Sequence, residues 1–214
     1  MSFNITLAII IITCLVSVPA FSSQKMIDDL IFYPPAIYRR NQWYRFFTCG
    51  FIHADWMHLA FNMISLYSLG SYVEGAFTEV FGGMGKVLYV VLYFTSLFFC
   101  LLPTYIKHRD NSYYRSLGAS GAVSAIVFAF ILLFPTTELN LLFIPGVPGF
   151  IFGALYLIIS SVMSKRGDSH INHSAHLWGA VYGIVFTVAA AFLLTDYNLP
   201  AIFLQQVQDY LRSI

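Results

Sequence analysis

Charged residues are scarce in this sequence. Only 10% of its 214 residues are Asp, Glu, Lys or Arg, whereas 58% are hydrophobic and the mean hydropathy is +0.73. A soluble domain carries about one quarter charged residues, so this chain has too few to cover a surface exposed to water. The net charge of +1 also provides no basic surface for nucleic acid. We therefore expect an integral membrane protein that binds no nucleic acid.

Cysteine pairs and metal-binding motifs are also lacking. The three cysteines lie far apart in the sequence, without the spacing of a disulfide framework or a metal site, and we interpret them as lone apolar residues: Cys14, Cys49 and Cys100. No Glu follows a His, which excludes the zinc protease motif H-E-x-x-H. We expect neither a metal nor another cofactor.

Histidines leave one metal-binding alternative open. His170, His173 and His176 recur every three residues and could hold a metal ion together with His53. No carboxylate or cysteine completes that set, so we expect His53, His108 and His170 to be ordinary loop histidines.

Long apolar runs dominate the chain. Runs of about 17–25 apolar residues span a bilayer as helices. Six spans are predicted, near 5–21, 56–73, 87–106, 117–134, 147–163 and 174–194. The first run could also be a signal peptide, but it lacks the basic region that precedes one, so we expect a retained span. The sequence predicts an all-α polytopic membrane protein.

The segments outside the spans are of two kinds. Aromatic and basic residues in 22–55 predict a structured first loop in the membrane interface. Residues 199–213 are predicted to form an amphipathic helix on the membrane surface. Because no internal repeat or low-complexity tract divides the chain, we expect residues 1–214 to form a single domain.

Polar side chains inside apolar spans are costly and tend to face the interior of a helix bundle. The second predicted span begins with His58 and Asn62, four residues apart on one helical face. The fourth span begins with Ser120 and the sixth with His176. Alternate spans begin on the same side of the membrane, and these residues lie within about one helical turn of each other in depth. We expect the four side chains to meet near one surface.

Two of these residues are suited to nucleophilic catalysis. A serine hydroxyl is activated by a histidine within hydrogen-bond reach, so Ser120 and His176 are a candidate nucleophile and general base. No acidic residue lies near them in the predicted spans, which favours a dyad over a triad. His58, Asn62 and the backbone N–H of Ser120 are candidate donors to an oxyanion.

Small residues predict close contact between the fourth and sixth spans. Gly121 begins a four-residue pattern of small residues in the fourth span, and Gly179 and Gly183 belong to one in the sixth. Such faces let two helix backbones approach closely in a membrane. This approach would bring Ser120 within reach of His176.

Four motifs resemble the rhomboid family of intramembrane serine proteases, over about residues 42–194. The stretch QWYRFFTCGFIHADWMHLAFN resembles the family's Trp-Arg loop and H-x-x-x-N helix, with Arg45 at the motif arginine. The stretch LGSYVEGAFTEVFGG resembles its glycine–glutamate turn, with Glu74 at the structural glutamate.

The other two motifs carry the candidate dyad. GASG, which begins with Gly118, resembles the family's G-x-S-G motif and makes Ser120 the nucleophile. AHLWGAVYG resembles A-H-x-x-G-x-x-x-G, makes His176 the base and includes Gly179 and Gly183. Each motif alone is weak, whereas four in the right order on the right spans are specific.

The resemblance implies both a fold and an activity. The implied fold is a six-transmembrane-helix rhomboid-like bundle that opens to water on one side. The implied activity is that of a serine endopeptidase, which cleaves transmembrane segments of other membrane proteins through an acyl-enzyme on Ser120. Substrates would enter laterally between the second and fifth spans, with residues 164–173 as a cap. The oligomeric state stays open.

The family also implies a location, in a bacterial-type plasma (inner) membrane with the active site opening to the outer face. The basic residues oppose this sidedness, because nine of the eleven lie in loops that the family places outside. They are Lys25, Arg39, Arg40, Arg45, Lys107, Arg109, Arg115, Lys165 and Arg166. We keep the family's orientation, because Arg45 and its neighbours belong to the predicted structured loop.

One position departs from the family pattern. Many members carry an aromatic residue one turn after the nucleophile, where it stacks on the catalytic histidine, but here that position is Ser124. The packing of His176 must then come from elsewhere. Two alternatives stay open, a non-catalytic rhomboid-like protein that binds membrane clients and a small transporter or channel.

Overall fold

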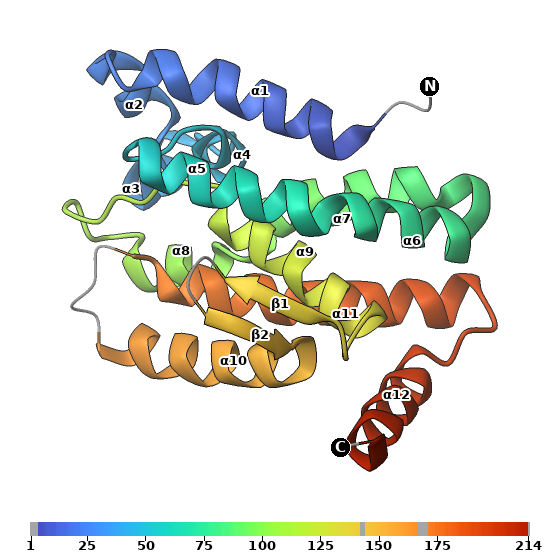
Figure 1. The fold of residues 1–214 in the computed structure, drawn as a ribbon. Coiled ribbons are helices and arrows are strands. Elements are labelled where there is room, and N and C mark those ends of the chain that lie inside the picture. The colour runs from blue at the N-terminus through green and yellow to red at the C-terminus, as the bar shows by residue number, and fades with distance from the viewer. Residues whose placement is uncertain (1–3, 142–143, 167–170, 214) are drawn as a thin grey trace.

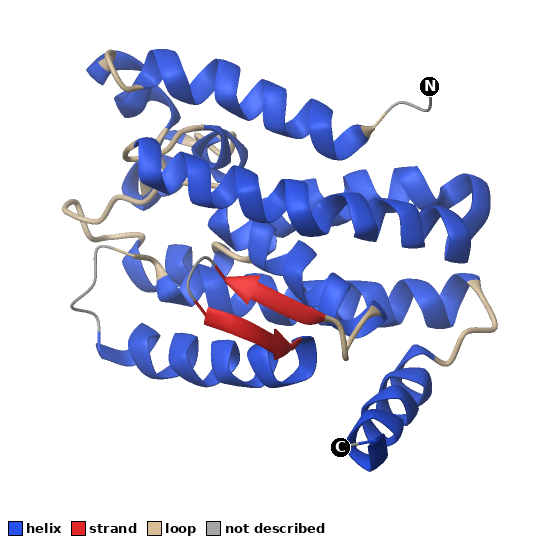
Figure 2. Cartoon of the chain, in the orientation of Figure 1, coloured by secondary structure: helices blue, strands red, loops and turns tan. Residues whose placement is uncertain are grey.

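Helices account for most of the architecture (Figures 1 and 2). The computed structural model describes residues 4–141, 144–166 and 171–213. The α-helices are α1 (Ile5–Ala20), α2 (Gln24–Leu30), α3 (Pro34–Arg40), α4 (Arg45–Thr48), α5 (Trp56–Ser65), α6 (Ser71–Phe81), α7 (Gly85–Phe99), α8 (Leu102–His108), α9 (Ser120–Leu133), α10 (Gly149–Arg166), α11 (His173–Leu194) and α12 (Leu199–Ser213). Shorter elements are the 3₁₀ turns η1 (Cys49–Phe51) and η3 (Gly82–Met84), the π-helical turn η2 (Leu66–Gly70), and the strands β1 (Glu138–Leu141) and β2 (Ile144–Pro148).

The central helix of the bundle is α9. Every residue from Gly121 to Ile131 is buried, and the helix packs against α6, α7, α10 and α11. A helix that is apolar on all sides is expected inside a bundle rather than at its surface. The most extensive contact is between α9 and α11, so the two helices that carry the candidate dyad are also the best packed pair.

Within the described parts of the chain, three helical stretches are long and apolar enough to cross a membrane, namely Trp56–His108, α10 and α11, while α1 and α9 are shorter apolar helices. The first stretch reverses direction at Gly82, whose φ of 55° suits a residue without a Cβ. It therefore holds two antiparallel limbs, the continuous helix from α5 to α6 and the helix α7 (Figure 1). These observations confirm the predicted fold class, an all-α polytopic membrane bundle.

The limb from α5 to α6 contains one wide turn. The turn η2 is π-helical and has α-helix on both sides. Glu74, which follows it, accepts hydrogen bonds from the backbone N–H groups of Ile5 and Thr6 and from the Thr6 hydroxyl, all at 2.9 Å. A carboxylate is favourable at the positive end of a helix. Glu74 therefore anchors the N-terminus of α1 to α6 by hydrogen bonds and lies away from the dyad.

The segment between α1 and α5 is folded, as the sequence predicts. Its buried Arg45 donates hydrogen bonds to the carbonyl oxygens of Asp28 and Ile31, both at 2.8 Å, and to Gln42 Oε1 at 2.6 Å. Burying a guanidinium is tolerable only when its donors are satisfied in this way. Arg45 holds this loop together and does not contact the dyad.

Two features differ from the elements expected from the sequence. The third apolar run divides into α7 and α8, with Pro103 in the first turn of α8, where its missing N–H costs no helix bond. A hairpin of β1 and β2, paired Glu138 to Pro148 and Leu139 to Val147, fills the connection between α9 and α10. Part of the expected cap, 167–170, lies outside the described residues and includes His170.

The last helix, α12, lies across one end of the bundle (Figure 1). Its Leu199 is buried, and the ring of Tyr210 lies 5.9 Å from that of Phe150 on α10. The opposite side exposes Leu204 and Leu211. Its position on the membrane surface stays a prediction.

Candidate active site

Two capping residues set the positions of the candidate histidines. Asp55 precedes α5 and its Oδ1 accepts the backbone N–H of His58 at 2.7 Å. Asn172 precedes α11 and its Oδ1 accepts the N–H of Ala175 at 3.0 Å. Asp and Asn are favoured at this position because they satisfy N–H groups that have no partner within the helix. Each histidine is thereby held in the first turn of its helix.

Glycines bring α9 and α11 together. A Cβ at Gly179 would overlap the carbonyl group of Gly121, and one at Gly183 would overlap the carbonyl of Ala125. A Cβ at Gly121 would in turn overlap Cys100 Sγ. The two backbones therefore approach as closely as the spacing of small residues predicts.

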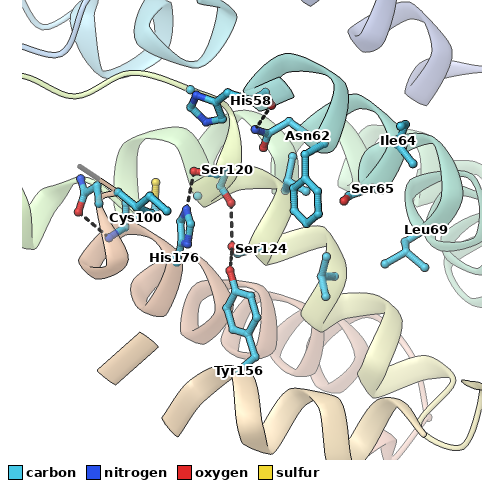
Figure 3. A pocket seen from close by; sticks show the side chains of 18 of the residues that line it. His58, Asn62, Ile64, Ser65, Leu69, Cys100, Ser120, Ser124, Tyr156 and His176 are labelled. Atoms are coloured by element: carbon cyan, nitrogen blue, oxygen red, sulfur yellow. Dashed lines mark hydrogen bonds between the residues drawn. The ribbon is translucent and has the colours of Figure 1, made fainter. Parts of the chain in front are cut away.

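Ser120 and His176 face each other across this contact. Ser120 is the first residue of α9, and its Oγ lies 2.7 Å from Nε2 of His176, as Figure 3 shows. This distance is within the range for proton transfer between a nucleophile and its base. No carboxylate contacts His176 among the residues that the structure describes. The geometry is that of a dyad.

The aromatic ring that stacks on His176 is supplied by α10, because α9 carries Ser124 where many family members have an aromatic residue. The ring of Tyr156 stacks on that of His176, with centroids 6.4 Å apart and an interplanar angle of 26°. Ser124 Oγ donates its proton to the Ser120 carbonyl oxygen at 2.7 Å, so the Tyr156 hydroxyl is the donor in its 2.6 Å hydrogen bond with Ser124 Oγ. Figure 3 shows this chain. The serine at position 124 indicated that the packing of His176 comes from elsewhere, but no motif on α10 pointed to Tyr156.

The candidate oxyanion donors lie on α5, on the opposite side of Ser120 from His176 (Figure 3). Gly118 has a φ of 113°, which favours glycine, and a Cβ there would lie 2.6 Å from the His58 ring. The absence of that Cβ lets the imidazole approach the loop before Ser120. Asn62 is buried and donates one amide proton to the His58 carbonyl at 2.8 Å, which leaves its second amide proton for a ligand.

His53 lies in the loop before α5, as expected from the sequence, but it is not an ordinary loop histidine. It is fully buried, its Nε2 accepts the N–H of Ala119 at 3.3 Å, and its Nδ1 lies 2.9 Å from Ser17 Oγ on α1. Ser17 donates its own proton to the Phe51 carbonyl at 2.8 Å, so Nδ1 of His53 is the protonated nitrogen. Burial lowers the pKa of His53 to about 3, and neighbouring His58 acts in the same direction. The neutral His53 ring thus links Ala119, the residue before Ser120, to Ser17 of α1 through two hydrogen bonds.

A cavity of about 1190 Å³ opens beside the dyad. Its lining includes Ser120, His176, His58 and Asn62, together with apolar side chains of α5, α9 and α10. Within the ranges that the structure describes, no group of three His, Cys, Asp or Glu side chains is placed to hold a metal ion. The cavity offers an acyl acceptor, a base and hydrogen-bond donors within a largely apolar wall.

Most of the chain is similar to a known protein family. The family described as "Rhomboid domain" matches residues 40–192. RHOMBOID-like protein 12, mitochondrial, of Arabidopsis thaliana is 32% identical over 154 residues, which cover 64% of this chain and 44% of that protein. Rhomboid protein 1, mitochondrial, of Saccharomyces cerevisiae is 30% identical over 147 residues, covering 64% and 39%. Presenilin-associated rhomboid-like protein, mitochondrial, of Rattus norvegicus is 29% identical over 137 residues, covering 63% and 34%.

These matches fix the family but not the location. The chain spans between about a third and a half of the length of these curated relatives. The family match and the long apolar helices support an integral membrane protein. The names of these relatives refer to mitochondria and give no support to the predicted bacterial-type plasma membrane. The family match covers the helices on which Ser120, His176, His58 and Asn62 lie, and the chain is therefore a member of the rhomboid family.

Proposed function

We propose that this protein is an intramembrane serine endopeptidase that cleaves transmembrane segments of other membrane proteins. The observation that supports this most directly is the 2.7 Å contact between Ser120 Oγ and His176 Nε2 beside a largely apolar cavity. Nε2 removes the proton of Ser120 Oγ as the oxygen attacks a carbonyl carbon, and the imidazolium then returns a proton to the leaving amine. The neutral imidazole then removes a proton from water as the water attacks the acyl-enzyme. The acid product leaves, and the proton returns to Ser120 Oγ.

The negative charge on the attacked carbonyl oxygen needs donors that are in place before the reaction. His58, the free amide proton of Asn62 and the backbone N–H of Ser120, in the first turn of α9, are the candidates. A helical substrate hides its carbonyl groups in its own hydrogen bonds, so the segment to be cut must unwind. We expect substrates with Gly or Pro near a small residue at that point.

A probe of serine reactivity tests this proposal without knowledge of the substrate. The detergent-purified protein is treated with a fluorophosphonate, and the labelled residue is identified by mass spectrometry. We expect labelling of Ser120 in the wild type and none in S120A or H176A, whereas S65A, another serine of the same cavity, retains it. A folded wild type that stays unlabelled, beside an active rhomboid that labels, would favour the alternative of a non-catalytic client-binding protein.

Sidedness forms a separate part of the proposal. We propose that the cavity opens on the outer face of its membrane, where the loops before α5, α9 and α11 would lie. Single cysteines at Asn111, in the loop before α9, and at Gly83, at the opposite end of the bundle, test this with a thiol reagent that does not cross membranes. Reaction of N111C but not G83C in intact membranes is expected, and the reverse pattern would invert the orientation.

A further inference from the structure

The cavity that holds the dyad extends to the opposite end of α9. Its lining continues past Tyr72 and Phe130 to Glu138, at the start of β1. Since α9 has 14 residues, its ends lie about 20 Å apart at 1.5 Å per residue. The cavity thus follows a path as long as about 13 residues of a helical substrate.

Glu138 is the acidic side chain at this far end. It is exposed, and its carboxylate lies over Gly146 of β2, where a Cβ would overlap it, so the hairpin leaves room for it. Among the described residues the carboxylate has no ion-pair partner. The walls that lead to it from the dyad carry apolar side chains such as Ile64 and Phe152. A charge beside a wall of low polarity attracts an opposite charge more strongly than it does in bulk water.

The surrounding charges favour a cation at the same end. The turns and helix ends opposite the dyad carry four exposed acidic residues against two basic ones, which are Glu79, Glu138, Asp196 and Asp209 against Lys86 and Arg212. At the dyad end the charges that line the cavity are balanced, because Arg115, which forms a 3.0 Å ion pair with Asp28, and Asp55 have opposite signs. The two ends of the cavity therefore differ in charge.

We propose that Glu138 is a specificity determinant, which selects transmembrane segments that carry Lys or Arg at the end opposite the scissile bond. The inference rests on the proposed function, because it names the substrates of the same site. On a helical segment that basic residue would lie about 12–15 residues from the scissile bond, since the cavity spans that length. A long Lys or Arg side chain can reach the carboxylate while its stem lies along the apolar wall.

Binding to the S120A variant separates this inference from catalysis. The ligands are three single-span Leu/Ala peptides that share a Gly-Ala-Gly segment at one end. They differ only in one residue, Lys, Gln or Glu, placed about 14 residues from that segment so that the spacing matches the length of the cavity at 1.5 Å per residue. We expect the Lys peptide to bind S120A about three- to tenfold more tightly than the Glu peptide, as predicted for one ion pair that the bound peptide partly buries. E138K in the same background should reverse this order, and E138Q should abolish the preference.

The matched control is E79K, which makes the same charge change at the same end but outside this cavity. It should leave the preference for the Lys peptide unchanged. The role of Glu138 would be overturned if all three peptides bound with equal affinity, as expected if the cavity holds lipid chains instead. It would also be overturned if E138K left the order of the affinities unchanged. Fluorophosphonate labelling of E138K with Ser120 intact reports separately on the dyad, so the failure of one proposal can be told from failure of the other.

Discussion

The ring of Tyr156 stacks on the imidazole of His176, with centroids 6.4 Å apart, although the two residues lie on different helices. Tyr156 belongs to α10 and His176 to α11, and the tyrosine hydroxyl is bonded to Ser124 of α9. Three helices thus meet at the candidate base. The orientation of the imidazole then depends on how α10 packs against α9 and α11.

Removing the Tyr156 ring should slow the reaction of Ser120. For Y156L we expect a fluorophosphonate labelling rate about tenfold lower, because a stacking contact and a hydrogen bond are each worth about 1 kcal/mol. Y156F keeps the ring and should lose about threefold or less. A labelling rate in Y156L equal to that of the wild type would show that the tyrosine does not position His176.

Removing an oxyanion donor should affect the rate more than the fold. For N62A we expect kcat to fall by about 10²–10³, the loss typical of one oxyanion-hole donor, with little change in KM. The measurement is cleavage of a single-span peptide, with the melting temperature as a check on folding. A kcat within about threefold of the wild type, well short of that typical loss, would remove Asn62 from the proposed set of donors.

Two glycines in long helices should respond to alanine in opposite ways. A Cβ at Gly179 meets the Gly121 carbonyl, whereas one at Gly75 has no atom within 4 Å. G179A should therefore separate α9 from α11, lower the melting temperature and abolish labelling of Ser120. G75A should leave both unchanged or raise stability by up to about 1 kcal/mol through helix propensity. Similar behaviour of the two variants would contradict the close approach of α9 and α11.

The buried His53 predicts a dependence of stability on pH. An unfolded histidine binds a proton near pH 6.5, but His53 in the folded protein stays neutral down to a pKa of about 3. The unfolded state therefore binds more protons in this window, and stability falls as the pH drops below about 6.5. From pH 7.5 to 5 the loss attributable to His53 is about 2 kcal/mol.

The pH experiment compares wild type with H53Q. Unfolding free energies in mixed micelles are measured at pH 7.5 and 5 for both proteins, so that contributions from the other histidines cancel. H53Q starts from a lower stability at pH 7.5 but should lose less on acidification. Parallel losses in the two proteins would show that His53 can accept a proton in the folded state.

The sequence was most informative where geometry follows from helical periodicity. The depth of His58, Ser120 and His176 follows from counting residues into alternate spans, and the contact of α9 with α11 follows from glycines at four-residue spacing. Both arguments need only the rise and repeat of an α-helix. This is why the candidate dyad could be predicted without a structure.

The supporting residues could not be found in this way. Tyr156 contacts His176 through the packing of α10, and nothing in its local sequence marks it among the other aromatic residues. His53 lies in a loop by sequence, and its burial depends on Ser17, 36 residues earlier. Contacts of this kind are set by tertiary structure, which periodicity does not encode. A clue was available for Tyr156, since a serine at position 124 left space beside the histidine.

The wide turn η2 has a consequence for how this family member can change over evolutionary time. A π-helical turn holds one residue more than an α-helical turn, so it rotates everything after it by about 100° relative to an uninterrupted α-helix. His58 and Asn62 precede the turn, and Glu74 follows it. Deleting one residue from Leu66–Gly70 would leave the oxyanion residues facing Ser120 but swing Glu74 away from the start of α1. The length of this segment is therefore constrained independently of its composition, because a deletion that keeps every remaining side chain would still misplace Glu74.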